Sequence, residues 1–215
     1  MNKTIIILAI LFSSAIISSG QSRFGISLKG GTNIPVGEFA DYFNAGYTFE
    51  GTLSYNVTHI YQIYFTTGYQ YFGFNDSDVK TKFMNENPGW NLEIDIPSTV
   101  IPVLSGFKWY LSIEDVKPFA SFEFGYYNYS VEVNGKVSDG SNEFVIDKEL
   151  SGWRLAYNLG LGVDVNVSRN IDAVFTARYN FSSQYYLDEI NNNRADLNFD
   201  SSQFISILAG INFNL

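Results

Sequence analysis

The stretch WRLAYNLGLGVDV, residues 153–165, decides the fold because large apolar residues alternate in it with small, polar or charged ones. Every odd-numbered position from Trp153 to Val165 is apolar, and the even-numbered positions include Arg154, Asn158 and Asp164. An α-helix repeats about every 3.6 residues and would mix these two sets, whereas a β-strand repeats every two residues and separates them. The stretch therefore predicts a β-strand with one apolar face and one polar face.

The same two-residue period continues through most of the chain. Phe175, for example, has apolar residues two positions away on either side, whereas Arg178 belongs to the opposite set. Turn-forming residues separate such segments from one another. We predict eight strands, at residues 24–33, 47–57, 61–74, 98–111, 118–130, 152–165, 171–181 and 203–215.

The charged residues of these segments decide which face is which. All eight share the phase of the small and polar residues: Lys29, Glu50, Lys108, Glu123, Arg154, Asp164, Asp172 and Arg178. A sheet face in contact with water is usually richer in Lys and Glu, so this sparse and balanced set favours an enclosed polar interior. The apolar face then points outward into lipid, as in transmembrane barrels. We predict a structural charge network in the lumen, made by Lys29, Glu50, Lys108, Glu123, Arg154 and Arg178.

The connections between the predicted strands alternate strictly between short and long. An up-and-down barrel collects its short turns at one end and its long loops at the other, and transmembrane barrels place the short turns on the periplasmic side. Tyr and Trp near the strand ends are typical of the two aromatic girdles of such a barrel. Asn134-Gly135, in the third long connection, is a hairpin signal. It leaves two interpretations open: strands that extend above the membrane, or a ten-stranded barrel.

The first residues read as a targeting signal. Lys3 precedes an apolar run over Thr4–Ile17, and small residues follow up to Gly20. This is the layout of a secretory signal peptide, and the run is too short to span a bilayer comfortably. We therefore expect a signal peptide at residues 1–20 and one barrel domain at residues 21–215.

Composition excludes several other classes of protein. The 215 residues contain no cysteine, which excludes a disulfide scaffold and a zinc-thiolate site. Thirteen basic residues face 22 acidic ones, so nucleic acid is not an expected partner. His59 is the single histidine. It lies in a predicted short turn, at the opposite end of the barrel from Asp76 and Ser77, so catalysis by these residues is not expected. We expect no enzymatic activity, no cofactor and no metal site.

Several segments carry a resemblance to a known family. They are Phe24–Gly31, Ile101–Leu104 followed by Phe107–Tyr110, Lys117–Ala120, Leu159–Val163 and Leu208–Leu215. With them the chain resembles the small outer-membrane β-barrel proteins of the OmpA/OmpX type, often called porin family proteins. Many relatives end in an aromatic residue, whereas this chain ends in Leu215. The resemblance covers about residues 24–215 and implies an all-β fold, an eight-stranded antiparallel up-and-down transmembrane β-barrel in the outer membrane.

The fold leaves three functions open. The first is a structural, adhesion or surface-interaction barrel whose lumen is filled by polar side chains. The second is a narrow porin-like channel for ions or small polar solutes, and the third is a secreted lipocalin-like binding protein with its apolar face inside. For the first we expect outer-membrane lipid and lipopolysaccharide as surroundings, extracellular loops as contact sites for partners, and a monomer.

Overall fold

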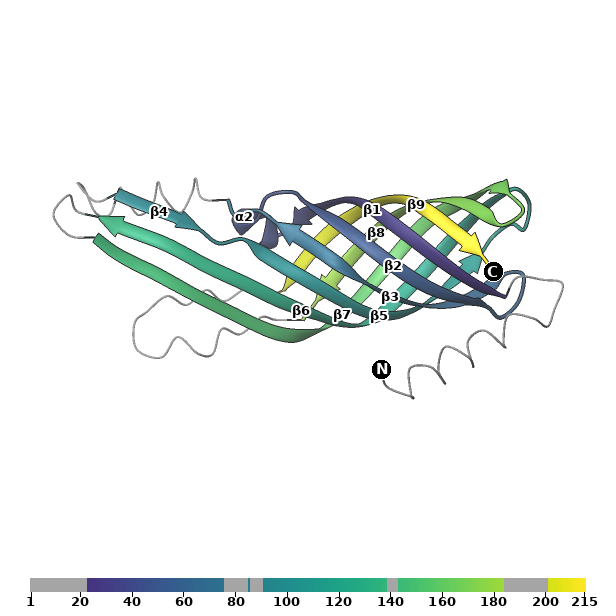
Figure 1. Ribbon diagram of the computed structural model, residues 1–215, viewed down its shortest axis with the longest axis horizontal. Helices are drawn as coiled ribbons and strands as arrows, with labels where there is room; N and C mark the ends of the chain where they lie inside the picture. The colour runs from purple at the N-terminus through teal and green to yellow at the C-terminus, as the bar shows by residue number, and fades with distance from the viewer. Residues whose placement is uncertain (1–22, 76–84, 86–90, 139–142, 184–200) are drawn as a thin grey trace, which may run out of the picture.

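The computed structural model describes residues 23–75, 85, 91–138, 143–183 and 201–215. Long antiparallel strands dominate it (Figure 1). All eight predicted strands are confirmed, and β6 and β7 extend well beyond their predicted ends. In chain order the elements are β1 Phe24–Val36, α2 Phe39–Tyr42, β2 Gly46–Asn56, β3 Tyr61–Phe72, β4 Asn91–Asp95, β5 Ser98–Tyr110, β6 Val116–Ser138, β7 Glu143–Ser168, β8 Ile171–Ser182 and β9 Ser202–Asn214.

Eight of these strands close into a ring. Its order is β1-β2-β3-β5-β6-β7-β8-β9, and the antiparallel pairing of β9 with β1 completes it. That pairing runs from Gly25 opposite Asn214 to Val36 opposite Gln203. Because the ring has no free edge, the backbone groups of the wall bond to one another, as a bilayer requires. Among the described residues, no helix is long and apolar enough to cross a membrane.

The ten-stranded alternative is wrong. The additional strand β4 lies outside the ring and pairs with the far part of β6, from Asn91 opposite Ser138 to Asp95 opposite Asn134. The predicted turn at Asn134-Gly135 is also wrong, because these residues lie inside β6 and pair with Asp147 and Ile146 of β7. The alternative interpretation of extended strands is confirmed, and β4, β6 and β7 form an arm that projects beyond the ring (Figure 1).

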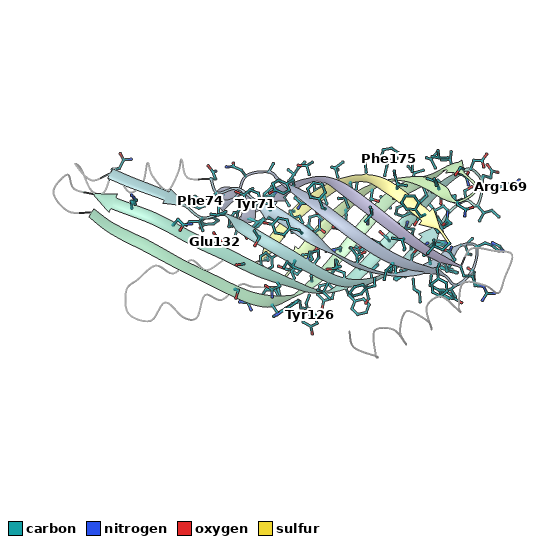
Figure 2. The ribbon with its side chains drawn as sticks, in the orientation of Figure 1. Tyr71, Phe74, Tyr126, Glu132, Arg169 and Phe175 are labelled. Carbon is teal, nitrogen blue, oxygen red and sulfur yellow. The ribbon has the colours of Figure 1, made fainter. Side chains whose placement is uncertain are left out.

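The apolar face of the wall points outward. Leu159 is 62% exposed and Phe175 is 51% exposed, whereas Arg178 is 1% exposed and Glu123 is 2% exposed. Figure 2 shows Phe175 and Tyr126 projecting from the outside of the barrel. Removing apolar surface from water lowers the free energy by about 25 cal/mol for each square ångström. An apolar exterior is therefore unfavourable in water and favourable in lipid. The lipocalin-like alternative, which requires an apolar interior, is therefore wrong, and the chain is a transmembrane barrel.

The two ends of the barrel differ. The turns after β2, β5 and β7 are short and lie at the same end as the C-terminus (Figure 1). By the topology of bacterial transmembrane barrels this is the periplasmic end, and single-chain barrels of this kind belong to the outer membrane. Tyr61 and Trp109 pair near this end, and Tyr47 and Tyr71 pair near the other. The predicted signal peptide lies outside the described residues and stays a prediction.

Candidate functional site: the closed lumen

An ion cluster crosses the middle of the lumen. Nη1 of Arg178 on β8 lies 3.1 Å from Oε2 of Glu123 on β6, and its Nη2 is paired with Glu50 on β2. Nζ of Lys29 on β1 lies 3.4 Å from Oε2 of Glu50. Both carboxylates are buried. These four residues, here called the Arg178 cluster, join four strands with two positive and two negative charges.

Uncharged side chains complete the bonding of the Arg178 cluster. Arg178 Nε donates a hydrogen bond to Asn180 Oδ1 at 2.8 Å. Glu123 accepts hydrogen bonds from Asn158 Nδ2 at 2.7 Å and from the Tyr64 hydroxyl at 3.0 Å. Burying ions costs free energy unless each is paired and hydrogen-bonded. This arrangement meets both conditions, so the charges can stay ionised away from water.

A second ion pair lies closer to the periplasmic end. Lys108 Nζ lies 3.0 Å from Asp164 Oδ2, which also accepts a hydrogen bond from the Tyr110 hydroxyl at 2.7 Å. The same Nζ stands 4.0 Å from the ring centre of Phe119, a cation–π contact. The Lys108–Asp164 pair, with one side chain from β5 and one from β7, therefore narrows the lumen on the periplasmic side of the Arg178 cluster.

The space between the Arg178 cluster and the Lys108–Asp164 pair is small. A cavity of about 20 Å³ is lined in part by Lys29, Tyr64, Lys108 and Arg178. A cavity needs roughly 10–15 Å³ to hold one water molecule. This cavity can therefore hold about one water molecule.

An aromatic plug closes the extracellular end of the lumen. It consists of Phe39 from α2, Phe43, Phe72, Tyr127 and Phe204, all buried. The ring centres of Phe39 and Phe72 are 5.2 Å apart, and those of Phe72 and Phe204 are 5.1 Å apart. Such contacts are typical of packed aromatic side chains. The lumen is thus polar in the middle and at the periplasmic end, whereas aromatic rings, with buried serine hydroxyls beside them, fill the extracellular end.

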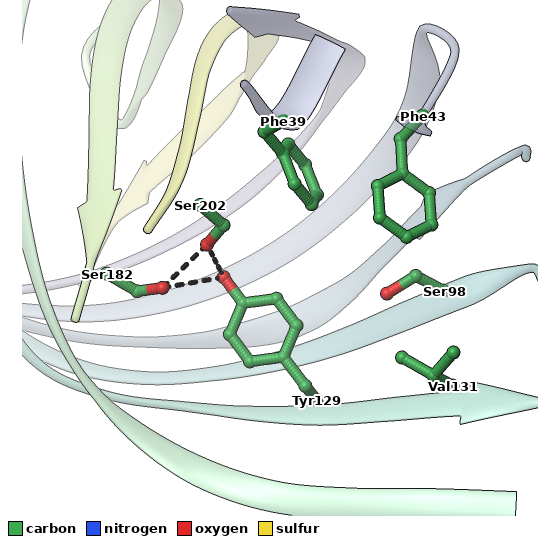
Figure 3. A pocket seen from close by; sticks show the side chains of 7 residues that line it. All are labelled: Phe39, Phe43, Ser98, Tyr129, Val131, Ser182 and Ser202. Carbon is green, nitrogen blue, oxygen red and sulfur yellow. Dashed lines mark hydrogen bonds between the residues drawn. The ribbon is translucent and has the colours of Figure 1, made fainter. Parts of the chain in front are cut away.

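Beside the plug lies a second cavity of about 20 Å³ (Figure 3). Phe39 and Phe43 stand on one side of it, and a group of hydroxyls stands on the other. The Tyr129 hydroxyl lies 3.0 Å from Ser182 Oγ and is also hydrogen-bonded to Ser202 Oγ, and the two serine oxygens are 2.6 Å apart. These hydroxyls satisfy one another, so they do not resemble an activated nucleophile, which needs an adjacent base.

The six residues of the predicted network occupy three places. Lys29, Glu50, Glu123 and Arg178 meet in the Arg178 cluster, and Lys108 joins the separate pair with Asp164. Arg154 is half-buried and lies apart, with its Nη1 donating to the carbonyl of Trp153 at 3.1 Å.

The sequence reasoning missed the aromatic part of the lumen. Phe72 and Tyr64 share the lumen phase of β3 with Gln62, and Phe204 shares that of β9 with Ser206. This common phase is the signal that could have placed these rings inside. The described residues contain no group of three or more His, Asp or Glu side chains that could hold a metal ion. His59 is exposed in the turn after β2, and Asp76 and Ser77 lie outside the described residues.

No family model and no curated protein sequence matches the chain. Solved structures do match it. Neisserial surface protein A is 14% identical with a TM-score of 0.53, over 92% of this chain and 100% of that chain. A major outer membrane protein from Thermus thermophilus is 10% identical with a TM-score of 0.54, over 88% of this chain and 98% of that chain. The chain thus has the fold of small outer-membrane β-barrels.

Proposed function

We propose that this protein is a closed structural and surface-interaction barrel of the outer membrane, without enzymatic activity. The observation that supports the proposal is that side chains fill the lumen at two levels. The Arg178 cluster spans it in the middle, and the aromatic plug spans its extracellular end. Eight-stranded barrels have interiors just wide enough for side chains to fill. The barrel then anchors the protein in the membrane, and its extracellular parts make the contacts with other surfaces.

The extracellular arm supports a role in surface contacts. β6 and β7 stay paired as far as Ser138 opposite Glu143, and β4 adds a third strand. Glu132, Asn134 and Lys136 of β6 are exposed on it. The arm projects beyond the lipid-facing wall (Figure 2). A partner on another surface can therefore reach it. Lipid and lipopolysaccharide surround the wall, and the ring within the membrane has no free edge to pair with a second copy, so we propose a monomer in the membrane.

Conductance of purified protein in planar bilayers tests the closed lumen. We expect no steady current from the native protein in concentrated salt. The double variant Arg178→Ala with Phe39→Ala removes one side chain from the Arg178 cluster and one from the plug. We expect it to conduct more than either single variant, although the Lys108–Asp164 pair and the other plug rings still narrow its lumen. A steady, salt-dependent current from the native protein would favour the second candidate, a narrow channel, and would refute the closed barrel.

A further inference from the structure

Three buried polar side chains lie on the inner side of β1, β2 and β3, between the aromatic plug and the Arg178 cluster. They are Asn33, Thr48 and Gln70, each 0% exposed. Thr48 pairs directly with Gln70 in the register, and Asn33 lies one diagonal step away, opposite Gly46. Phe72 of the plug lies two residues after Gln70 on β3, and Glu50 of the Arg178 cluster lies two residues after Thr48 on β2. The three side chains thus form one polar group, here called the Gln70 group.

The Gln70 group carries four polar atoms without a hydrogen-bond partner among the described residues. They are Asn33 Nδ2, Thr48 Oγ1 and both amide atoms of Gln70. A buried polar group left without a partner costs about 1–3 kcal/mol. Four such atoms within one group are unusual, because most buried polar atoms in proteins are paired.

On the neighbouring strands β8 and β9 the buried polar side chains bond to one another. Ser206 Oγ donates to Asn33 Oδ1 at 2.6 Å, and Asn180 Nδ2 donates to Ser206 Oγ at 2.8 Å. Asn180 in turn accepts from Arg178 Nε at 2.8 Å. A chain of hydrogen bonds therefore runs from the Arg178 cluster through β8 and β9 to Asn33. It ends at the Gln70 group, where the unpaired atoms begin.

We propose that the Gln70 group binds ordered water, which completes this chain of hydrogen bonds across β1, β2 and β3. The group offers donors from two amides, an acceptor from one amide and a hydroxyl that can act as either. A buried water molecule makes about three hydrogen bonds and needs such a mixed set. The nearby ions of Glu50 and Arg178 are already paired with each other, so the group presents no uncompensated charge that would attract an ion. Water is therefore the ligand that fits.

Nuclear magnetic resonance of the native protein in detergent micelles tests this directly. We expect transfer of magnetisation from water to the side-chain amides of Asn33 and Gln70, with the sign that marks a long-lived bound molecule. The side-chain amide of Gln62 is the control, because it is also buried but its Nε2 donates to an amide oxygen, Asn56 Oδ1, rather than to a hydroxyl. Signals confined to exposed amides such as that of Asn44 would overturn the proposal.

The Thr48 hydroxyl exchanges protons with solvent and could imitate bound water. The variant Thr48→Val removes this hydroxyl with little change of shape. We expect the transfer to Gln70 to persist in T48V. Its loss in a folded T48V protein would show that the hydroxyl relayed it and would overturn the proposal.

Stability gives an independent test. Gln70→Leu removes both unpaired amide atoms. If they are bonded to water, the unfolding equilibrium constant should rise about tenfold, as expected for a lost buried hydrogen bond. Gln62→Leu is the control, since the Gln62 amide donates to Asn56 Oδ1 at 2.8 Å. An unfolding constant that falls in Q70L while it rises in Q62L would mean that the Gln70 amide is unsatisfied and would refute bound water.

Discussion

Arg178 reaches Glu50 across the lumen, although β9 and β1 separate their strands in the ring. Arg178 Nη1 lies 3.1 Å from Glu50 Oε2, and the two residues are 128 positions apart in the chain. The contact exists only when the β1–β9 pairing has closed the barrel. It therefore couples the folding of the wall to the pairing of ions inside it.

Replacing Arg178 with Met should be strongly destabilising. The variant leaves Glu50 and Glu123 buried without their shared cation, and breaking a buried ion pair in this way costs about 3–5 kcal/mol. Urea unfolding in lipid vesicles measures the loss. The matched control is Arg169→Met in the exposed turn after β7, which should change the free energy of unfolding by less than about 0.5 kcal/mol.

A triple variant separates charge from packing at the same site. Arg178→Met combined with Glu50→Gln and Glu123→Gln removes both uncompensated carboxylates. We expect it to recover part of the lost stability, because neutral amides cost less to bury than carboxylates. A triple variant less stable than the single one would show that Arg178 acts by filling space rather than by pairing ions.

Leu159→Arg places a charge on the lipid-facing wall. Arg near the bilayer midplane costs about 2–4 kcal/mol in transmembrane barrels. The variant should insert poorly into vesicles, which a heat-dependent shift in gel mobility reports. His59→Arg in the exposed periplasmic turn is the control and should insert normally. Equal insertion of both variants would contradict the outward orientation of Leu159.

Gly31 should not tolerate even a methyl group. A Cβ there would stand 1.9 Å from the backbone oxygen of Ile207, so the β1–β9 contact that closes the ring would have to shift. We expect Gly31→Ala to lose about 1–3 kcal/mol, the usual cost of overpacking. Gly51→Ala is the control, because a Cβ there meets nothing within 4 Å. Equal unfolding midpoints for the two variants would contradict the close approach at Gly31.

Removing a ring from the plug should cost more than removing one from the outer wall. Phe204→Ala opens a cavity in the buried cluster, and such changes cost about 3–5 kcal/mol. Phe213→Ala on the same strand removes a ring that is 40% exposed and faces outward, so its cost should be smaller. Unfolding midpoints of the two variants in the same lipid give the comparison, and equal losses would argue against a packed plug.

The two-residue period predicted the wall well, because alternation directly reports which face each side chain takes. The alternation alone predicts that Leu159 points outward and Arg178 inward. It did not predict that Arg178 pairs with Glu50 and Glu123, because these contacts depend on barrel closure and strand tilt. It also missed the plug, since the aromatic prediction covered only the membrane girdles and placed neither Phe72 nor Phe204. Phe72 and Phe204 show that phase, rather than position along the strand, decides which rings point inward.

The local turn signal misled at Asn134-Gly135. An Asn-Gly pair favours a tight turn, but here the cross-strand partners Asp147 and Ile146 keep the dipeptide in an extended strand. Pairing with β7 on one side and β4 on the other outweighs the local preference. Tertiary pairing of this kind is not visible in a short window of sequence.

The orientation of the wall is the central claim, and spin-label accessibility tests it most directly. The chain has no cysteine, so single Cys substitutions label one site each. Labels at Leu159→Cys and Phe175→Cys should collide with oxygen dissolved in the bilayer and not with a water-soluble nickel reagent. A label at Asn170→Cys, in the exposed turn after β7, should show the opposite preference. Strong collision of the Leu159 and Phe175 labels with the nickel reagent, and weak collision with oxygen, would contradict a barrel whose apolar face meets lipid.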